Sequence, residues 1–254
     1  ETRELKVTVG RNDEFKYAYR IDDKDAPFDA AGEAWLAEVL VDIIRKTGIG
    51  AEERANRILD REGVNGLLEE VQLVESDYVI RIYLGTALSR PDLTPDDCAS
   101  ILEEAALAMD SDYEKAELLL SVAHHRSWSS SLAAAYVDVA ATMESDYEIR
   151  RSLAAIELDE DTEQGVIDAV LQVAIRMESD YEVAELLIGL APRCNGSVQL
   201  SEMYVQAASG LESDYEARRA LSELNWRKGL SSNTVIGALV IAGGLDSDYE
   251  SAEL

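Results

Sequence analysis

The sequence is poor in several of the residues and motifs on which enzymes and metal sites depend. Its 254 residues include only two cysteines and two histidines, too few for a disulfide scaffold or a typical zinc site. The longest apolar run, Val235 to Leu245, is interrupted by glycines and is too short to span a bilayer. G-x-S-x-G, H-E-x-x-H, P-loop and Rossmann glycine motifs are all absent. The sequence therefore predicts no enzyme, no cofactor, no metal and no membrane insertion.

Positive charge is also scarce. There are 23 lysines and arginines against 51 aspartates and glutamates, giving a formal net charge of −28. Such a field repels phosphate backbones, so nucleic acid is not an expected partner, and a basic protein or peptide is favoured. The 47% of hydrophobic residues exclude an acidic disordered tail and are ample for a packed core.

What the sequence does contain is an internal repeat. The tripeptide Ser-Asp-Tyr occurs six times, spaced by 35 residues once and then by 34 each time. An acidic residue precedes it, and Glu follows it in all copies but the first. A fixed period in the thirties indicates stacked helical repeats. The six serines, from which positions are counted below (+ toward the C-terminus), are Ser76, Ser111, Ser145, Ser179, Ser213 and Ser247.

Each repeat reads as two helices. Ser followed by Glu at +3 is a capping box, in which Ser binds the N3 amide and Glu reaches back to the Ser amide, so one helix begins at each Ser. Apolar residues lie at +8 and +11, and at +4 in four of the six copies, and the residue at +8 is always Leu. A preceding helix carries Ala at −5 in five copies, which permits close helix packing. The short turn between the helices requires an antiparallel hairpin.

A second pattern alternates between repeats. Arg150-Arg151 and Arg218-Arg219 occupy +5 and +6 in two copies, whereas Ala-Glu occupies these positions in the copies beside them. If the repeats stack, each arginine pair lies between glutamates of neighbouring repeats. The alternative is that these are solvated charges that contribute little. Position −9 alternates in the same way, because only the two Arg-Arg copies have tyrosine there. These residues are Tyr136 and Tyr204.

The N-terminal segment departs from the repeat. Residues 1–28 read as a β-hairpin from Leu5 to Ile21 followed by a polar link, which we expect to pack on the first helices as an end cap. Residues 29–64 read as capping helices: one runs from Asp29 to about Gly48, and two further pieces, 51–61 and 65–74, flank Gly63. Residues 65–254 form the repeats, the last one incomplete. We thus expect a mainly α fold, a right-handed α-solenoid of antiparallel helix hairpins with a short N-terminal β-hairpin.

The period resembles that of the tetratricopeptide repeat, although the Trp, Leu-Gly, Tyr and Pro consensus of that family is absent, so its peptide-carboxylate clamp is not carried over. The chain looks more like an α-solenoid of bacterial proteins with Ser-Asp-Tyr-Glu repeats. That resemblance implies an interaction scaffold in an exported or cell-envelope protein.

Two further motifs have simpler explanations than metal binding. Asp110 to Glu114 has the look of a calcium loop, but Lys115 stands where that loop needs glycine, and helix capping accounts for the acids. His124 and His125 are adjacent, so they point about 100° apart on a helix, and no third ligand is at hand. Cys98 lies nearly three repeats from the second cysteine, Cys194, too far for a disulfide, so both are expected to be free.

A binding site should lie where the repeats differ, in the loops that join one hairpin to the next. Aromatic and arginine side chains dominate binding energy at interfaces. In these loops the candidates for contact with a partner are Arg126, Trp128, Arg193, Trp226 and Arg227. The alternative is that the two tryptophans plug the ends of their hairpins. The motif tyrosines, such as Tyr113, are expected to be largely buried between hairpins.

These observations predict a non-enzymatic protein- or peptide-binding scaffold with a strongly acidic surface. The alternative is a structural subunit. If the open C-terminal repeat accepts the N-terminal hairpin of another copy, the contact is head-to-tail and builds a filament.

Overall fold

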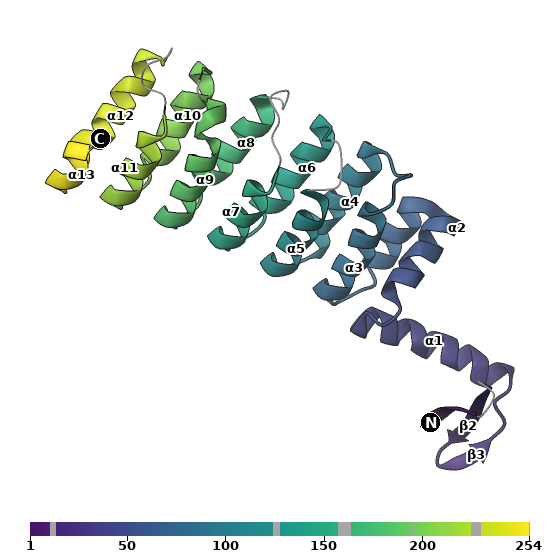
Figure 1. The fold of residues 1–254 in the computed structure, drawn as a ribbon. Coiled ribbons are helices and arrows are strands. Elements are labelled where there is room, and N and C mark those ends of the chain that lie inside the picture. Colours follow the sequence, from purple (N-terminus) through teal and green to yellow (C-terminus); the bar gives the residue numbers. More distant parts are fainter. Residues whose placement is uncertain (11–13, 124–127, 157–163, 195, 225–229, 254) are drawn as a thin grey trace.

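A computed structural model describes the chain except residues 11–13, 124–127, 157–163, 195, 225–229 and 254. The described residues form thirteen helices and three strands. The protein is mainly helical, with a small antiparallel sheet at the N-terminus (Figure 1). The predicted fold class is confirmed at this level.

The N-terminal sheet has three strands in the order β1-β2-β3, where two were predicted. Leu5 pairs with Tyr19 across β1 and β2. Asp22 and Asp23, expected to begin a polar link, both have positive φ, of 47° and 64°. Positive φ at both central residues makes a tight hairpin turn, and the chain therefore returns as a third strand. The strands are β1 (Arg3–Val9), β2 (Phe15–Ile21) and β3 (Lys24–Ala26).

Two helices follow, and they match the predicted ends except that the second helix stops at Val71, three residues before the predicted end. The carboxylate of Asp29 accepts hydrogen bonds from two amides in the first turn of α1 (Ala30–Thr47), and Gly48 ends this helix at φ 74°. Helix α2 (Ala51–Val71) is interrupted at Gly63, where φ is 69° and ψ is −163°, so it consists of two pieces. Glycine adopts these angles without the steric cost that a side chain brings.

The sheet contacts the start of α1 rather than the repeats. Tyr19 lies against Phe28 and Trp35, with ring centroids 5.6 Å apart in both pairs. Figure 1 shows the sheet at the far end of α1, away from the other helices. The first repeat is covered by α2, which contacts α3 and α4. The end cap that we predicted from the hairpin is thus supplied by a helix.

One buried glutamate joins the N-terminal helices. Glu70, in the second piece of α2, pairs with Arg45 of α1 and Arg54 of the first piece of α2, each through two hydrogen bonds of 2.7–3.0 Å. Burial acts to raise the pKa of Glu70, but the hydrogen bonds from the two arginines outweigh it and lower the pKa to about 2. The carboxylate therefore stays charged and holds three helical segments together.

The remaining helices stand in two rows (Figure 1). In the first row each helix begins one residue after a motif serine. Each contacts the next helix of its own row, and hairpin partners contact across the rows. The first row is α3 (Asp77–Leu88), α5 (Asp112–Ala123), α7 (Asp146–Ala154), α9 (Asp180–Cys194), α11 (Asp214–Ser222) and α13 (Asp248–Glu253). The second row is α4 (Pro95–Ala108), α6 (Ser130–Ala141), α8 (Gln164–Ala174), α10 (Val198–Ala208) and α12 (Ser232–Gly244).

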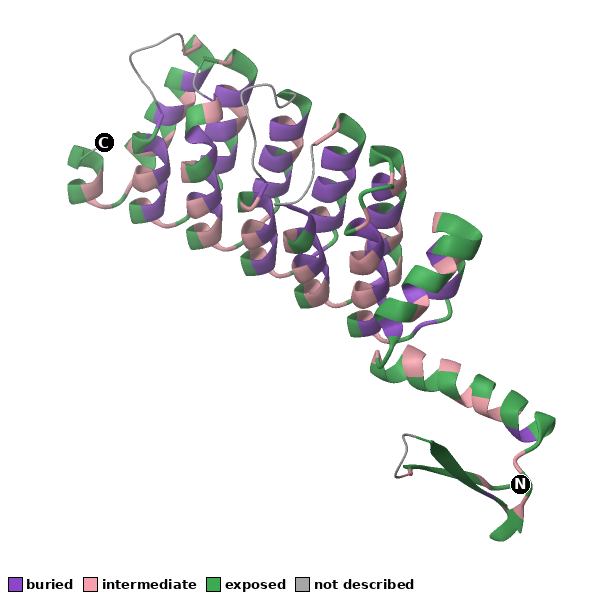
Figure 2. Ribbon diagram, turned by 45° about the vertical axis from the view of Figure 1, so that its right-hand side comes forward, coloured by how far each residue is buried: buried purple, intermediate pink, exposed green. Residues whose placement is uncertain are grey.

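The core lies between the two rows, as the colouring of Figure 2 shows. Every leucine at +8 is buried, as is every residue from Ala87 to Leu224 at +11. Tyr136 and Tyr204 are also buried, and their hydroxyls donate to the carbonyl oxygens of Ser152 and Ala220. The helical pattern and the alternation at −9 therefore both reflect the core. The leucines are Leu84, Leu119, Leu153, Leu187 and Leu221.

Both cysteines are buried and neither forms a disulfide, as predicted. Burial raises the pKa of Cys194 to about 12, which leaves its sulfur protonated and unreactive at neutral pH. Within the described part of the chain, every helix is too short or too polar to cross a bilayer.

Candidate functional site

Each residue of the Ser-Asp-Tyr-Glu motif has its own structural setting, beginning with the serine. The hydroxyl of Ser145 accepts a hydrogen bond from the Glu148 amide at 3.4 Å, and four other copies match it at 3.3–3.5 Å. Ser76 makes no such bond. The second half of the predicted capping box is wrong, because the glutamate does not return to the serine amide.

That amide is bound instead by the aspartate of the preceding repeat. The amides of Glu178 and Ser179 donate to the Asp146 carboxylate at 2.8 and 2.6 Å. The same arrangement recurs with Asp77, Asp112 and Asp180 as acceptors, and at the last junction the Ser247 amide alone donates to Asp214. Each aspartate therefore caps the turn of the following repeat, a stacking role that the single-helix view of the motif missed.

The glutamates pair with arginines, as the alternation predicted. Arg150 contacts Glu182 of the next repeat, whereas Arg151 contacts Glu117 of the preceding repeat and Glu148 of its own. The second arginine pair repeats this pattern, and Arg81 pairs with Glu114. The side chains of these arginines are only about a quarter exposed, so the ion pairs form part of the contact between hairpins.

The tyrosine is the one motif residue that the fold does not use in this way. The prediction that these rings are buried is wrong, since they are between 48% and 68% exposed. At about 100° per residue, +2 lies on the side of the helix opposite the stripe at +4, +8 and +11. No hydroxyl of the six has a hydrogen-bond partner among the described residues. The tyrosine row, as we call it, comprises Tyr78, Tyr113, Tyr147, Tyr181, Tyr215 and Tyr249.

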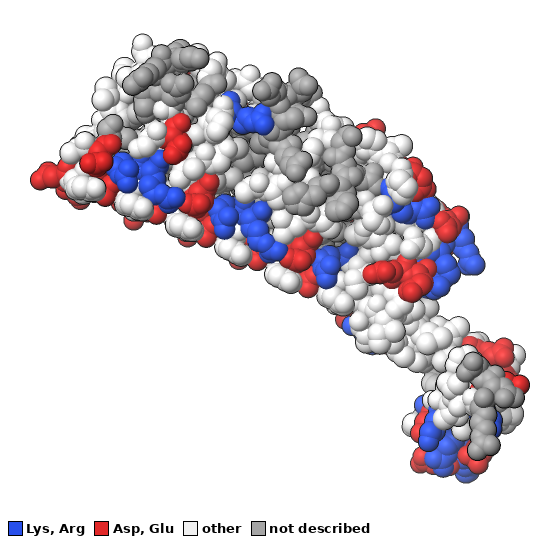
Figure 3. Space-filling view, in the orientation of Figure 1, with Lys and Arg blue, Asp and Glu red and all other residues white. Residues whose placement is uncertain are grey.

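The tyrosine row runs along one edge of the molecule because each ring occupies the same position on successive helices of the first row. Arg150 lies over the ring of Tyr147, with 5.4 Å between the guanidinium carbon and the ring centroid, and Tyr78 and Tyr215 have similar contacts. No described cation lies over Tyr113 or Tyr181. Figure 3 shows acidic and basic side chains alternating along this edge.

Three residues before every tyrosine of the tyrosine row stands an acidic residue, at −1. All six are exposed, and none has an ion-pair partner among the described residues. The edge therefore combines half-exposed aromatic rings with uncompensated carboxylates at the period of the repeat. These acids are Glu75, Asp110, Glu144, Glu178, Glu212 and Asp246.

The residues predicted to contact a partner lie elsewhere. Arg126, Trp226 and Arg227 fall outside the described residues, as do His124 and His125. Trp128 precedes α6 and is half-buried; its ring packs edge-on against that of Tyr136, with centroids 5.2 Å apart. Arg193 lies in the last turn of α9.

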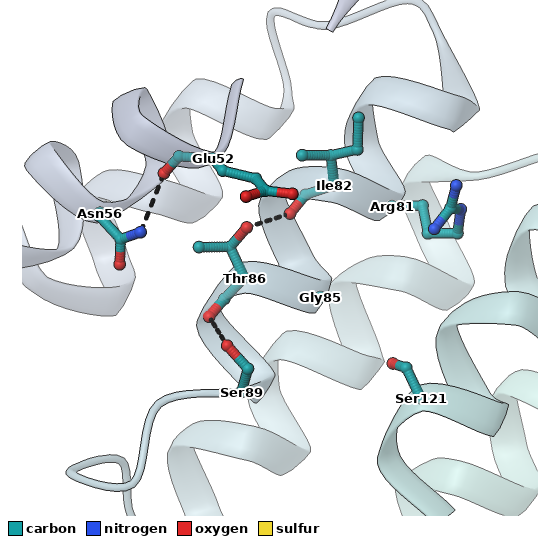
Figure 4. A pocket seen from close by; sticks show the side chains of 8 residues that line it. All are labelled: Glu52, Asn56, Arg81, Ile82, Gly85, Thr86, Ser89 and Ser121. Carbon is teal, nitrogen blue, oxygen red and sulfur yellow. Dashed lines mark hydrogen bonds between the residues drawn. The ribbon is translucent and has the colours of Figure 1, made fainter. Parts of the chain in front are cut away.

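A hollow between α2, α3 and α5 has the lining drawn in Figure 4. Its side chains are mostly engaged within their own helices: Asn56 donates to the Glu52 carbonyl, and Thr86 to the Ile82 carbonyl. Arg81 is held by Glu114. No convergent set of polar groups is left for chemistry. The lining is Glu52, Asn56, Arg81, Ile82, Gly85, Thr86, Ser89 and Ser121.

Neither a metal site nor a similarity to a known protein indicates a function. No three His, Cys, Asp or Glu side chains of the described segments are arranged to hold a metal ion. No family model, no curated protein and no solved structure matches the chain.

Proposed function

We propose that this protein is a non-enzymatic scaffold that binds a protein or peptide along the tyrosine row. In this proposal the two rows of helices form a right-handed α-solenoid of antiparallel hairpins. Stacked hairpins suit this role because they present one surface feature many times over.

One observation carries the proposal. Ser caps its own helix, and Asp and Glu join neighbouring repeats, whereas the tyrosine hydroxyl has no partner among the described residues and about half of the side chain is exposed. A half-exposed tyrosine contributes little to folding, but aromatic side chains are prominent in interfaces. A ligand-binding role accounts for its presence in all six copies.

Charge supports a basic partner. The net charge of −28 attracts cations over a distance, and an exposed carboxylate at −1 precedes each tyrosine of the row by three residues. Such complementarity speeds association and disfavours acidic competitors, while the aromatic contacts supply much of the affinity.

The test is selection from a random peptide library, with the wild type and the Tyr113→Ala/Tyr181→Ala variant as baits. Peptides enriched on the wild type should bind the variant about tenfold more weakly, corresponding to about 1.4 kcal/mol. Tyr17→Ala is the matched control, because Tyr17 is 50% exposed but lies in the sheet. Selected peptides that bind all three proteins equally, or a failure to select any, would reject the tyrosine row as a binding site.

Binding at the loops that join one hairpin to the next remains a separate prediction. If Trp128 contacts the partner, Trp128→Ala should lower the affinity for the selected peptides while leaving the unfolding midpoint unchanged. Its contact with the buried Tyr136 ring favours the opposite result, lower stability with unchanged affinity. Combining this change with Trp226→Ala extends the test to the second tryptophan.

Self-association is a second candidate because apolar side chains are exposed at both ends of the chain. On the sheet, Val9 and Phe15 face each other in the β1–β2 register and are more than 60% exposed. On α12, Leu239 and Val240 are equally open. Docking of one copy's sheet on another's α12 would give a head-to-tail filament. Light scattering should then rise with concentration, and Leu239→Asp should abolish the rise.

A further inference from the structure

We propose that the ligand of the tyrosine row is a basic segment in the polyproline II conformation, lying along the row with one three-residue turn per repeat. This inference rests on the proposed function and assigns the chemistry of its partner. Three properties of the edge lead to it: its spacing, its charge and the state of its rings.

The spacing fits this conformation better than an extended strand. Packed helices lie about 8–10 Å apart, so neighbouring rings of the tyrosine row recur at about that interval. A polyproline II helix rises 3.1 Å per residue with three residues per turn, which repeats every ~9.3 Å. Residues on one face of a β-strand recur every ~6.6 Å, so they do not match the interval between neighbouring rings of the tyrosine row. An α-helical ligand needs a hydrophobic groove, whereas charged side chains accompany these rings, including the arginines over Tyr78, Tyr147 and Tyr215.

Charge selects the side chains of the ligand. Each repeat offers one unpaired carboxylate at −1, such as Glu144 or Glu178. A ligand with Lys or Arg at every third position would place one cation near each of them. Aromatic rings flanked by acids bind proline rings and basic side chains together, which is how proline-rich segments are recognised elsewhere. A neutral polymer would gain nothing from these carboxylates.

The rings themselves show how a cation is accommodated. At Tyr147 and Tyr215 the protein's own arginines at +5 lie over the ring, 5.4 and 5.5 Å from its centroid. At Tyr113 and Tyr181 the residue at +5 is alanine, and no described cation takes that place. A guanidinium of the ligand fits over these two rings in the position that Arg150 occupies over Tyr147. Such a contact is favourable because the negative face of the aromatic ring attracts the cation.

The experiment uses synthetic peptides and the whole chain. A peptide of Pro-Pro-Arg units and one of Gly-Ser-Arg units, equal in length and charge, are titrated by calorimetry at about 0.15 M salt. The proline peptide should bind about tenfold more tightly, because its conformation costs less entropy to order. Tyr113→Ala/Tyr181→Ala should remove about tenfold of its affinity, and Tyr113→Phe/Tyr181→Phe should change it by less than about threefold.

Equal affinity for the two peptides would overturn the conformational assignment, and so would no measurable binding of either. Equal affinity of the wild type and the alanine variant for the proline peptide would overturn its placement on the tyrosine row. The library separates the two proposals: tyrosine-dependent binders without basic or proline-rich sequences keep the proposed function and reject this inference. Circular dichroism of every variant confirms that the fold is retained.

Discussion

The N-terminal part of the chain, residues 1–74, and the repeats that follow are held together in different ways. In the N-terminal part the contacts occur once: Glu70 binds two arginines, and Tyr19 packs against two other rings. In the repeats the same contacts recur at every junction. Stability in such an array is close to a sum of nearest-neighbour terms. A single change should therefore cost much in the first region and little in the second.

The largest expected effect is at Glu70. Replacement by Gln removes a buried charge and leaves Arg45 and Arg54 without their partner, which should cost about 3 kcal/mol. Hydrogen exchange followed by mass spectrometry should show faster exchange in α1 and α2, with little change in α7 to α11. Glu69→Gln, at an exposed neighbouring position, is the control. Uniform acceleration along the whole chain would contradict the division into two regions.

Acid should act on the same residue. The pKa of Glu70 is lowered to about 2 in the folded protein, from about 4.3 in an unfolded chain. A lowered pKa stabilises the fold at pH values above the unfolded pKa, and this contribution is lost as pH falls from about 4.3 toward 2. The loss should appear in α1 and α2 and be absent from the Glu70→Gln protein. If the stability of the Glu70→Gln protein fell as steeply as that of the wild type between about pH 4.3 and 2, the effect would not come from Glu70.

Within the repeats, the aspartate caps should have the next largest effect. Asp146→Ala removes a carboxylate that accepts from two amides of the following turn and should cost about 1.5 kcal/mol in urea unfolding. Asp248 occupies the same motif position, but no described turn follows it, so Asp248→Ala should change little. Equal losses in the two variants would show that the aspartate acts within its own helix and not on its neighbour.

The smallest expected effect is at the serine caps. Ser179→Ala removes a long hydrogen bond of 3.5 Å and should lower stability by about 0.5–1 kcal/mol. Ser76 makes no capping bond, so Ser76→Ala should leave the urea midpoint unchanged. A loss at Ser76 as large as that at Ser179 would mean that the geometry of the cap does not govern its contribution.

The repeats were more predictable from sequence than the N-terminal part, because periodicity carries information about neighbours. The period placed the +8 leucines in the core and the arginine pairs between glutamates. No such pattern relates Arg45, Arg54 and Glu70, which come together only through tertiary structure. The third strand was missed because Asp22-Asp23 is a weak sequence signal for a positive-φ turn.

The exposure of the tyrosines was mispredicted for another reason. Their presence in every repeat favoured a role in the scaffold, and therefore a buried position. The position of the tyrosine at +2, opposite the apolar stripe, already places it away from the core. Its exposure could thus have been read from the sequence. The cap that each aspartate supplies to the next repeat could not have been predicted from the sequence, because it depends on the distance between helices.

The aspartate caps also bear on the order in which the repeats fold. The carboxylate that receives the amides of a turn always belongs to the repeat before it, and the ribosome releases that repeat first. Each new turn therefore follows the repeat that carries its acceptor. A hairpin that docked before the repeat preceding it would lack this cap. We therefore expect the hairpins to dock in the order of their synthesis.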